Sequence, residues 1–234
     1  MTVFPEMFTP LSYSIIDRAV KSKLVELHIH NLRDFAEDNH KSVDDAPYGG
    51  GSGMVMTVPI LYKAVEFIKK QNPTAPVYLT SPQGKVLTQE MCREFSKLDG
   101  MILVCAHYEG VDERFIELAC DGEISIGNYI LTGGEIPAMV IADSTIRLIQ
   151  GVIDSQSALE ESFTDDRLDY PQYTRPLEFM GLKVPEVLLS GNHEKIKKWR
   201  ELQKTTNTLK KRPELLVKKR IDENNIKRNT SREN

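Results

Sequence analysis

The stretch that decides the fold is SIGNYILTGGE, residues 125–135. It begins as an apolar strand and then breaks up at Thr132, Gly133 and Gly134. Glycine permits tight turns and a close approach of backbone to a ligand, because it carries no Cβ. From composition alone two interpretations stay open: an unusual turn, or a backbone-lined pocket for a flat, polar small molecule.

The segments around this stretch alternate between predicted strands and helices. Strands are expected at 24–32, at the start of 75–85, at 100–105 and just before the glycines. In the segment 75–85, a Ser-Pro-Gln-Gly turn is expected to end the strand. Helices are expected at 11–24, 58–70, 87–98 with Thr88 as the N-cap, 111–120 and after residue 135. Apolar strands separated by helices predict an α/β sheet covered on both faces. Ligands bind outside the carboxyl ends of such strands, so the loops TSPQG (80–84), AHYEG (106–110) and GNYILTGGE (127–135) are expected to meet.

Charge divides the chain unevenly. The 234 residues carry a net charge of -4, but residues 1–170 sum to -12 and residues 171–234 to +8. Such a sign change favours a basic module that meets a polyanion, although a solvated helical tail gives the same pattern. The sequence predicts a linker over 154–170, a basic helix from about residue 193, and a frayed end over 222–234.

The totals predict a cytoplasmic protein with no membrane partner. No apolar run approaches the ~20 residues that a membrane-spanning helix needs, and the N-terminal residues do not resemble a signal peptide. The three cysteines, Cys92, Cys105 and Cys120, lie too far apart for a zinc knuckle and are expected to be reduced, buried thiols. No metal-ligand pattern is found in the sequence. A nicotinamide oxidoreductase is disfavoured because GxGxxG is missing.

Five motifs in order resemble one family closely: DDAPYGGGSGM (44–54), LTSPQGK (79–85), CAHYEGVDER (105–114), SIGNYILTGGEIPA (125–138), and YTRP (173–176) with VPEVLLSGNH (184–193). The family is the bacterial tRNA (guanine-N1)-methyltransferases, and the resemblance covers almost the whole chain. It implies methylation of guanine 37 of tRNA with S-adenosylmethionine, by a homodimer whose active sites are each built from both subunits.

The resemblance also implies a knotted architecture, that of the SPOUT methyltransferases. The expected fold is an α/β domain with a parallel sheet and a trefoil knot over residues 1–153, a flexible linker over 154–170, and a small basic helical domain for tRNA over 171–234. Positions matching the cofactor site of the family are Leu79, Thr80, Ser81, Pro82, Gly84, Ala106, Tyr108, Glu109, Gly110, Ile126, Gly127, Asn128, Tyr129, Ile130, Leu131, Gly133, Gly134 and Pro137.

The catalytic residues are also implied by the resemblance. Guanine N1 carries a proton, so a carboxylate general base is expected. The family has an aspartate in an EDSF stretch, and here EESF places Glu161 at that position, with Asp169 as the second candidate. Arg147 matches the arginine that stabilises the guanine. Asp44, with Ser52 in the same loop, matches the substrate-contact region. Some members depend on Mg²⁺, for which Glu109 is the candidate neighbour.

The chain departs from the family pattern at several positions. Glu161 replaces the aspartate, Asn128 stands in IGNY where IGDY is usual, and Ala106 replaces a glycine. Gln150 and Ser52 each replace a proline. These departures leave a catalytically impaired or differently specific SPOUT RNA-binding protein as the alternative, and a pure RNA-binding module as a further one. Without the family, Glu161 would be a solvated linker acid and Arg147 a salt-bridging helix residue.

Overall fold

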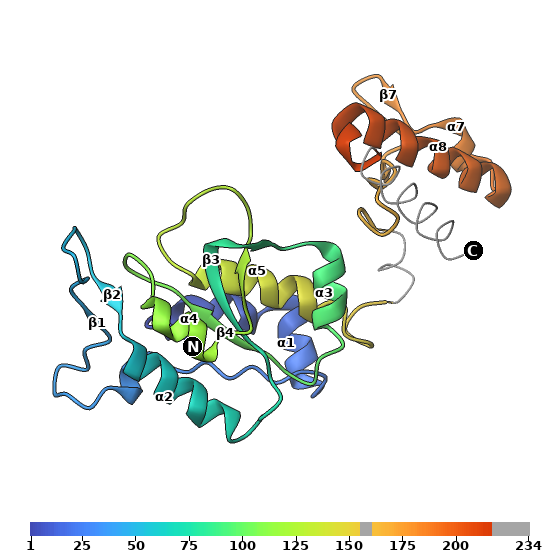
Figure 1. Cartoon of the computed structure of the whole chain (residues 1–234). Helices are drawn as coiled ribbons and strands as arrows, with labels where there is room; N and C mark the ends of the chain where they lie inside the picture. The colour runs from blue at the N-terminus through green and yellow to red at the C-terminus, as the bar shows by residue number, and fades with distance from the viewer. Residues whose placement is uncertain (155–160, 217–234) are drawn as a thin grey trace, which may run out of the picture. The chain divides into compact units, whose positions relative to one another are not determined.

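The computed structural model describes residues 1–154 and 161–216. Contacts divide the chain into two compact units, Met1–Asp154 and Ser155–Asn234 (Figure 1). The predicted frayed end, 222–234, lies outside the described residues, as does the part of the predicted linker from 155 to 160. No helix in the described ranges combines the length and the apolar character needed to cross a membrane.

The first unit is built on a parallel sheet of three strands in the order β4-β3-β5. These are β4 (Ile102–Cys105), β3 (Val77–Val86) and β5 (Gly122–Ser125). The central strand pairs in parallel with both neighbours. Parallel strands that are buried on both faces have apolar sequences such as ILVC, and this agrees with the predicted α/β class.

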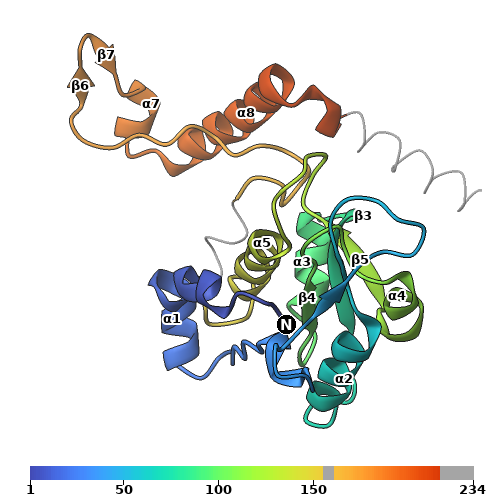
Figure 2. The ribbon, with the colours of Figure 1, turned by 90° about the vertical axis from the view of Figure 1, so that its left-hand side faces the viewer.

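Helices cover both faces of the sheet (Figure 2). On one side lie α2 (Val58–Lys69) and α4 (Glu113–Ala119), which pack against each other; on the other lie α3 (Gln89–Phe95) and α5 (Glu135–Ile146). The largest core cluster joins the sheet to α2 and α4 through residues such as Leu61, Val77 and Phe115.

Shorter elements complete both units. The first unit also holds η1 (Pro5–Ser12), α1 (Ser14–Lys21), η2 (Leu32–Phe35), and the antiparallel pair β1 (Asp44–Asp45) and β2 (Val55–Met56). The second unit holds the antiparallel pair β6 (Glu178–Phe179) and β7 (Leu182–Lys183), followed by α7 (Glu186–Leu189) and the 19-residue α8 (His193–Lys211).

Helix starts follow local side-chain chemistry. Thr88 caps α3 as predicted, because its hydroxyl accepts a hydrogen bond from Met91 N at 3.2 Å. Asp112 caps α4, and Asn192 caps the basic helix α8. The helix predicted over 11–24 is shorter than expected: Tyr13 is extended (φ -133°, ψ 163°), so α1 begins at Ser14.

Two strand predictions differ from the structure. The turn at 81–84 does not end β3, because Lys85 and Val86 return to the sheet and pair with Ile124 and Ser125 of β5. The strand predicted over 24–32 is not formed: the backbone is extended, but only Asn31 makes a bridge, with Thr2. Alternating side chains make an extended segment, but a strand also needs a partner for its backbone.

Candidate functional site

Three loops meet at the carboxyl ends of the strands, as the sequence predicts. They surround a pocket of ≈ 330 Å³, within the range of small-ligand pockets. Its lining comes from 80–82, 106–110, 124–127 and 129–134, with Pro137 from α5. Of the predicted cofactor residues, only Leu79, Gly84 and Asn128 are not in this lining.

Gly134 shows why part of this lining must be bare backbone. Its N–H donates to Ala106 O at 2.7 Å and so ties the third loop to the second. A Cβ at Gly134 would lie 2.6 Å from Ala106 N and would overlap Thr80 Oγ1. The three loops therefore pack together at a point that no larger residue could occupy without displacing them.

The first loop is held against β5 by a second close approach. Ile124 pairs with Thr80 before the loop and with Lys85 after it. Gly84 sits between these two pairings, where a Cβ would lie 2.6 Å from the Glu123 carbonyl oxygen. Gly84 thus shapes the pocket without lining it, and Leu79 does the same from its buried position in β3.

The third loop folds back on itself through local hydrogen bonds. Ser125 Oγ lies 3.2 Å from Gly127 N, and Tyr129 Oη donates to Ile126 O at 3.1 Å. Apolar side chains remain outside this turn: Tyr129 is 55% exposed and Ile130 is 80% exposed. The loop therefore carries exposed apolar side chains on residues that also line the pocket.

A buried carboxylate stands behind the third loop. Glu135 is fully buried and accepts a hydrogen bond from Thr2 Oγ1 at 2.8 Å. Its other oxygen lies 3.6 Å from Nδ1 of His107, which lines the pocket. Neither Glu135 nor His107 is among the site residues predicted from the sequence. The sequence feature that could have indicated Glu135 is its position directly after Gly133 and Gly134, where the helix that follows the third loop begins.

Cys105 precedes the second loop but does not act as a nucleophile. It is fully buried, and burial raises the pKa of its thiol to about 12. Only the thiolate reacts readily, so this side chain stays neutral near pH 7. All three cysteines are free; Cys92 is also buried and Cys120 is partly buried.

The second loop brings the glycine-rich segment 44–54 to the pocket. Tyr108 lines the pocket with a left-handed backbone (φ 60°). Burial raises the pKa of its hydroxyl, and a side-chain hydrogen bond with Asp44 raises it further. Glu109 N donates to Met54 O at 3.0 Å. Asp44 therefore reaches a pocket residue, whereas Ser52 lies exposed in the loop between these contacts.

Arg147 lies at the other end of α5 from the pocket. The helix begins at Glu135, beside the third loop, and Arg147 is its C-cap. At ~1.5 Å per residue the 12-residue helix separates the two ends by ~18 Å. The fold of a single chain thus does not bring Arg147 into its own pocket.

The two predicted carboxylates, Glu161 and Asp169, belong to the second unit and lie on adjoining segments. Ser162 Oγ accepts a hydrogen bond from Asp169 N at 2.9 Å. The Asp169 carboxylate accepts from Tyr170 N at 2.7 Å, and its carbonyl accepts from Asn207 of α8 at 3.0 Å. Asp169 thus helps to hold this segment against α8.

Further contacts fix residues 161–170 against α8. Arg167 forms ion pairs with Asp165 and, at 2.8 Å, with Glu201 of the helix. Hydrogen bonding to Asp165 raises the pKa of the Arg167 guanidinium. Leu168 N donates to Thr208 Oγ1 at 2.9 Å. The candidate catalytic segment is therefore held by side chains, although the boundaries proposed for linker and domain remain a prediction.

Within residues 1–154 and 161–216, no group of three or more His, Cys, Asp or Glu side chains comes together as a metal site would require. Glu109 contributes a single carboxylate at the pocket. A Mg²⁺ ion that keeps several waters is commonly bound by one or two carboxylates together with substrate oxygens. Glu109 fits that limited role.

Comparison with known proteins agrees with this geometry. The family model described as tRNA (Guanine-1)-methyltransferase TrmD matches residues 1–218. The chain belongs to this family. A tRNA (guanine-N(1)-)-methyltransferase of Caldanaerobacter subterraneus is 55% identical over 97% of this chain and 94% of its own length. Those of Caldicellulosiruptor saccharolyticus and Dictyoglomus turgidum are 52% and 50% identical, covering 92% and 97% of this chain and 88% and 92% of theirs.

Proposed function

We propose that this member of the tRNA (guanine-1)-methyltransferase family transfers a methyl group from S-adenosylmethionine to N1 of guanine 37 in tRNA. The methyltransferase class follows from the family match over residues 1–218. The observation that carries the site assignment is the meeting of three strand-end loops around one pocket, at which Gly134 leaves no room for a side chain. Such a pocket suits a flat, polar nucleoside.

The pocket is suited to the cofactor because glycines stand at positions where a side chain would take up space. Gly134 and Gly127 keep the lining free of side chains at two positions, because a Cβ at Gly134 would collide with Ala106 and one at Gly127 would collide with Tyr129. We assign Ser81, Ala106 and Gly133 among the residues that would hold the nucleoside. S-Adenosylmethionine, when bound, supplies an electrophilic methyl group on a sulfonium.

The chain supplies acid–base chemistry at the guanine. N1 is protonated and weakly nucleophilic, so we propose that the Glu161 carboxylate accepts this proton and that Arg147 stabilises the negative charge developing on O6. Asp44, held beside the pocket by Tyr108, would contact the base edge. Mg²⁺ near Glu109 would further neutralise the developing charge.

A homodimer would bring these groups together. Arg147 lies a helix length from its own pocket, so a second copy would have to present it there. Apolar side chains stand exposed beside the pocket, among them Ile130, Ile136 and Val140. Exposed apolar patches commonly mark interfaces. In a two-fold symmetric dimer, the same patch of both subunits would form the contact.

Three finer features belong to the same proposal. The double pairing of Ile124, before and after the first loop, supports a trefoil knot in this sheet. The lysines and arginines of α8 would meet tRNA phosphates, so binding would weaken as salt rises. The enzyme would work in the cytoplasm, where tRNA is modified and free thiols stay reduced.

The function is tested with labelled S-adenosylmethionine, Mg²⁺ and two tRNA transcripts that differ only at position 37. Labelling of the guanine transcript but not of the adenine transcript is expected, with label at N1. Labelling of both transcripts would indicate another target base and favour the differently specific alternative. Cofactor binding with no labelling of either would favour the impaired alternative.

A further inference from the structure

A carboxylate and an imidazole lie side by side directly behind the cofactor pocket. Glu135, the first residue of α5, is fully buried, whereas His107 of the second loop lines the pocket. Oε2 of Glu135 lies 3.6 Å from Nδ1 of His107. Both atoms are buried, and neither makes a hydrogen bond with any residue in the described ranges. Buried polar atoms are usually paired, so two unpaired atoms at this distance require an explanation.

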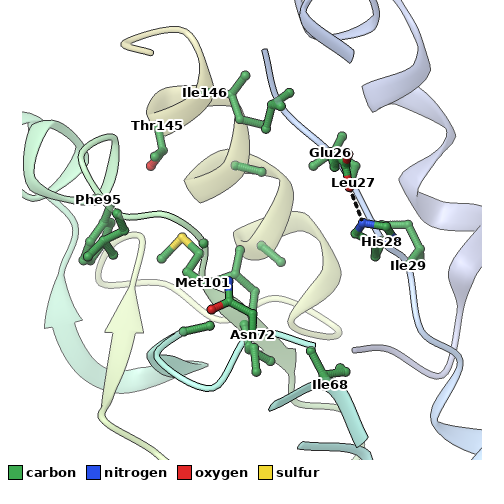
Figure 3. Close-up of a pocket in the computed structure, with 18 of the residues that line it drawn as sticks. Glu26, Leu27, His28, Ile29, Ile68, Asn72, Phe95, Met101, Thr145 and Ile146 are labelled. Carbon is green, nitrogen blue, oxygen red and sulfur yellow. Dashed lines mark hydrogen bonds and ion pairs between the residues drawn. The ribbon is translucent and has the colours of Figure 1, made fainter. Parts of the chain in front are cut away.

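The carboxylate of Glu135 is closed off from both hollows of the first unit. A groove of ≈ 740 Å³ runs between the extended segment 24–30 and α5 (Figure 3). Met1, Cys105 and Ala138 belong to the lining of this groove. Glu135 itself lines neither the groove nor the cofactor pocket. A carboxylate enclosed in this way needs partners supplied by the protein, because burying an unpaired charge is costly.

The neighbours of Glu135 leave one of its oxygens to His107. Thr2 Oγ1 donates a hydrogen bond to Oε1 at 2.8 Å and so satisfies the other oxygen. Burial raises the pKa of the Cys105 thiol to about 12, so this neighbour carries no charge near pH 7. Desolvation lowers the pKa of the Met1 amino group, which disfavours its charged form. His107 is therefore the neighbour best placed to donate to Oε2.

The His107 ring is held in place by two other aromatic rings. Phe4 meets it edge-on with ring centroids 4.9 Å apart, and Tyr108 does so at 5.1 Å. Phe4 also donates its backbone N–H to Thr2 Oγ1 at 2.9 Å, and this is the hydroxyl that bonds to Glu135. Because N–H···O bonds are usually about 2.7–3.2 Å long, a shift of less than ~1 Å would turn the contact of His107 with Glu135 into a hydrogen bond.

The two side chains support the pocket lining at Gly133. A Cβ on Gly133 would lie 2.5 Å from Oε2 of Glu135 and 2.6 Å from Nδ1 of His107. The backbone of Gly133, which lines the pocket, therefore packs on the same two atoms that approach each other. Because protein interiors are closely packed, a change in the separation of these atoms has to move this backbone.

We propose that His107 is a positioning residue for the cofactor. Its Nδ1 carries a proton and donates a hydrogen bond to Oε2 of Glu135, and this bond fixes the backbone of Gly133 at the lining. The inference rests on the proposed function, because it concerns the cofactor of that reaction, and it adds a residue to the acid–base groups assigned at the guanine. His107 acts on the binding of S-adenosylmethionine and not on the transfer step.

The test replaces His107 by two amides that differ in reach. Asparagine places its amide nitrogen near the position of Nδ1, whereas the longer glutamine places it near that of Nε2. His107→Asn therefore keeps a donor for Glu135 and His107→Gln does not, although both side chains are neutral and polar. His40→Gln, at an exposed position, is the matched control. Calorimetric titration gives the Kd for S-adenosylmethionine, steady-state kinetics give KM and kcat, and thermal unfolding shows whether each variant is folded.

His107→Gln is expected to raise the Kd and the KM for S-adenosylmethionine by ~10-fold or more, the loss expected for a hydrogen bond to a charged group. The kcat at saturating cofactor should change little, because the bond contributes equally to the ground state and the transition state. His107→Asn and His40→Gln should bind the cofactor nearly as well as the unmodified protein. Equal binding by the two folded His107 variants, whether weak or normal, would overturn the inference.

A second measurement locates the proton directly and needs neither cofactor nor tRNA. The chain has five histidines, so the ring-nitrogen NMR signals of His107 are identified by their loss in His107→Asn. A protonated Nδ1 is expected in the unmodified protein, and Glu135→Gln should shift these signals while those of His40 stay unchanged. A ring protonated at Nε2 alone would overturn the inference. A protonated Nδ1 in a protein that fails to bind S-adenosylmethionine would support the bond to Glu135 and contradict the proposed function, so the two failures are distinguishable.

Discussion

The proposed cofactor pocket in the first unit depends on glycines that leave no room for a side chain, whereas the segment 161–170 in the second unit is held in place by side-chain contacts. Gly134 matters because it has no Cβ, and its neighbours are the backbone of Ala106 and the hydroxyl of Thr80. Glu161 is proposed to act through its carboxylate, in a segment held by contacts of Arg167 and Asp169. Substitutions in the pocket should therefore act through volume and lower cofactor affinity, and those in the segment through charge and lower turnover.

The largest effect is expected for Glu161→Gln, which keeps the shape of the side chain and removes the base. Turnover should fall ~10²–10⁴-fold, the usual contribution of a general base, while the Kd for S-adenosylmethionine stays unchanged. Single-turnover methyl transfer and calorimetric titration measure the two quantities. The matched control is Asp169→Asn, which should mainly lower stability. If Asp169→Asn has the larger effect on turnover, Asp169 is the base.

Arg147→Ala should lower turnover ~10²-fold, the scale for losing one charge-stabilising group. Its position also tests whether a site spans two copies. When this variant is mixed with Gly134→Ala under conditions that exchange subunits, mixed dimers would hold one complete site each. About a quarter of the normal activity should then return, as random pairing of two chains predicts. A mixture as inactive as its parents would show that each chain is self-sufficient.

Asp44→Ala should affect the substrate more than the cofactor. Losing one hydrogen bond from a charged group costs about 1.5 kcal/mol, or ~10-fold in KM for tRNA. Removing the bond to Tyr108 should also let the pKa of that tyrosine fall toward its usual value, since Asp44 raises it. Ser52→Ala, in the exposed part of the same loop, is the control. An equal loss in both variants would place the effect in the loop rather than in the carboxylate.

The smallest effect on activity is expected for Thr88→Ala. The variant loses the N-cap bond to Met91 N, which costs ~1 kcal/mol of unfolding free energy and lowers the midpoint by ~2–4 °C. Neither kcat nor cofactor affinity should change, because α3 contributes no residue to the pocket lining. Thermal unfolding measures the change in midpoint, and steady-state kinetics show whether kcat and cofactor affinity are unchanged. A loss of activity without a loss of stability would mean that α3 positions the site.

The sequence predicts features that depend on neighbours along the chain. Thr88 caps its helix because the bond to Met91 is local. The meeting of the three loops also follows, since parallel strands share one carboxyl edge. The return of β3 to the sheet after Gly84 does not, because the Ser-Pro-Gln-Gly signal describes only a turn, while the pairing of Lys85 with Ile124 spans about forty residues of chain.

The segment 24–32 and the residue Glu135 both depend on contacts with residues far away in the sequence, which a local pattern does not predict. Alternation identified an extended segment, but a strand also needs a backbone partner, and the bridge found in this segment is that of Asn31 with Thr2. Glu135 follows the glycines in the sequence, yet its burial and its bond to Thr2 appear only when the N-terminal residues are placed. Arg147 and Glu161 were assigned by family resemblance, and Arg147 lies at the other end of α5 from the pocket.

The central claim is that the three-loop pocket binds S-adenosylmethionine through bare backbone. The most direct test is calorimetric titration of S-adenosylmethionine into Gly134→Ala beside Gly122→Ala, whose Cβ would meet only Tyr78 at 3.4 Å. Gly134→Ala should weaken binding ~10–100-fold, as expected for 1–3 kcal/mol of overpacking, while Gly122→Ala binds normally. Undiminished binding by a folded Gly134→Ala protein would contradict the assignment of this pocket.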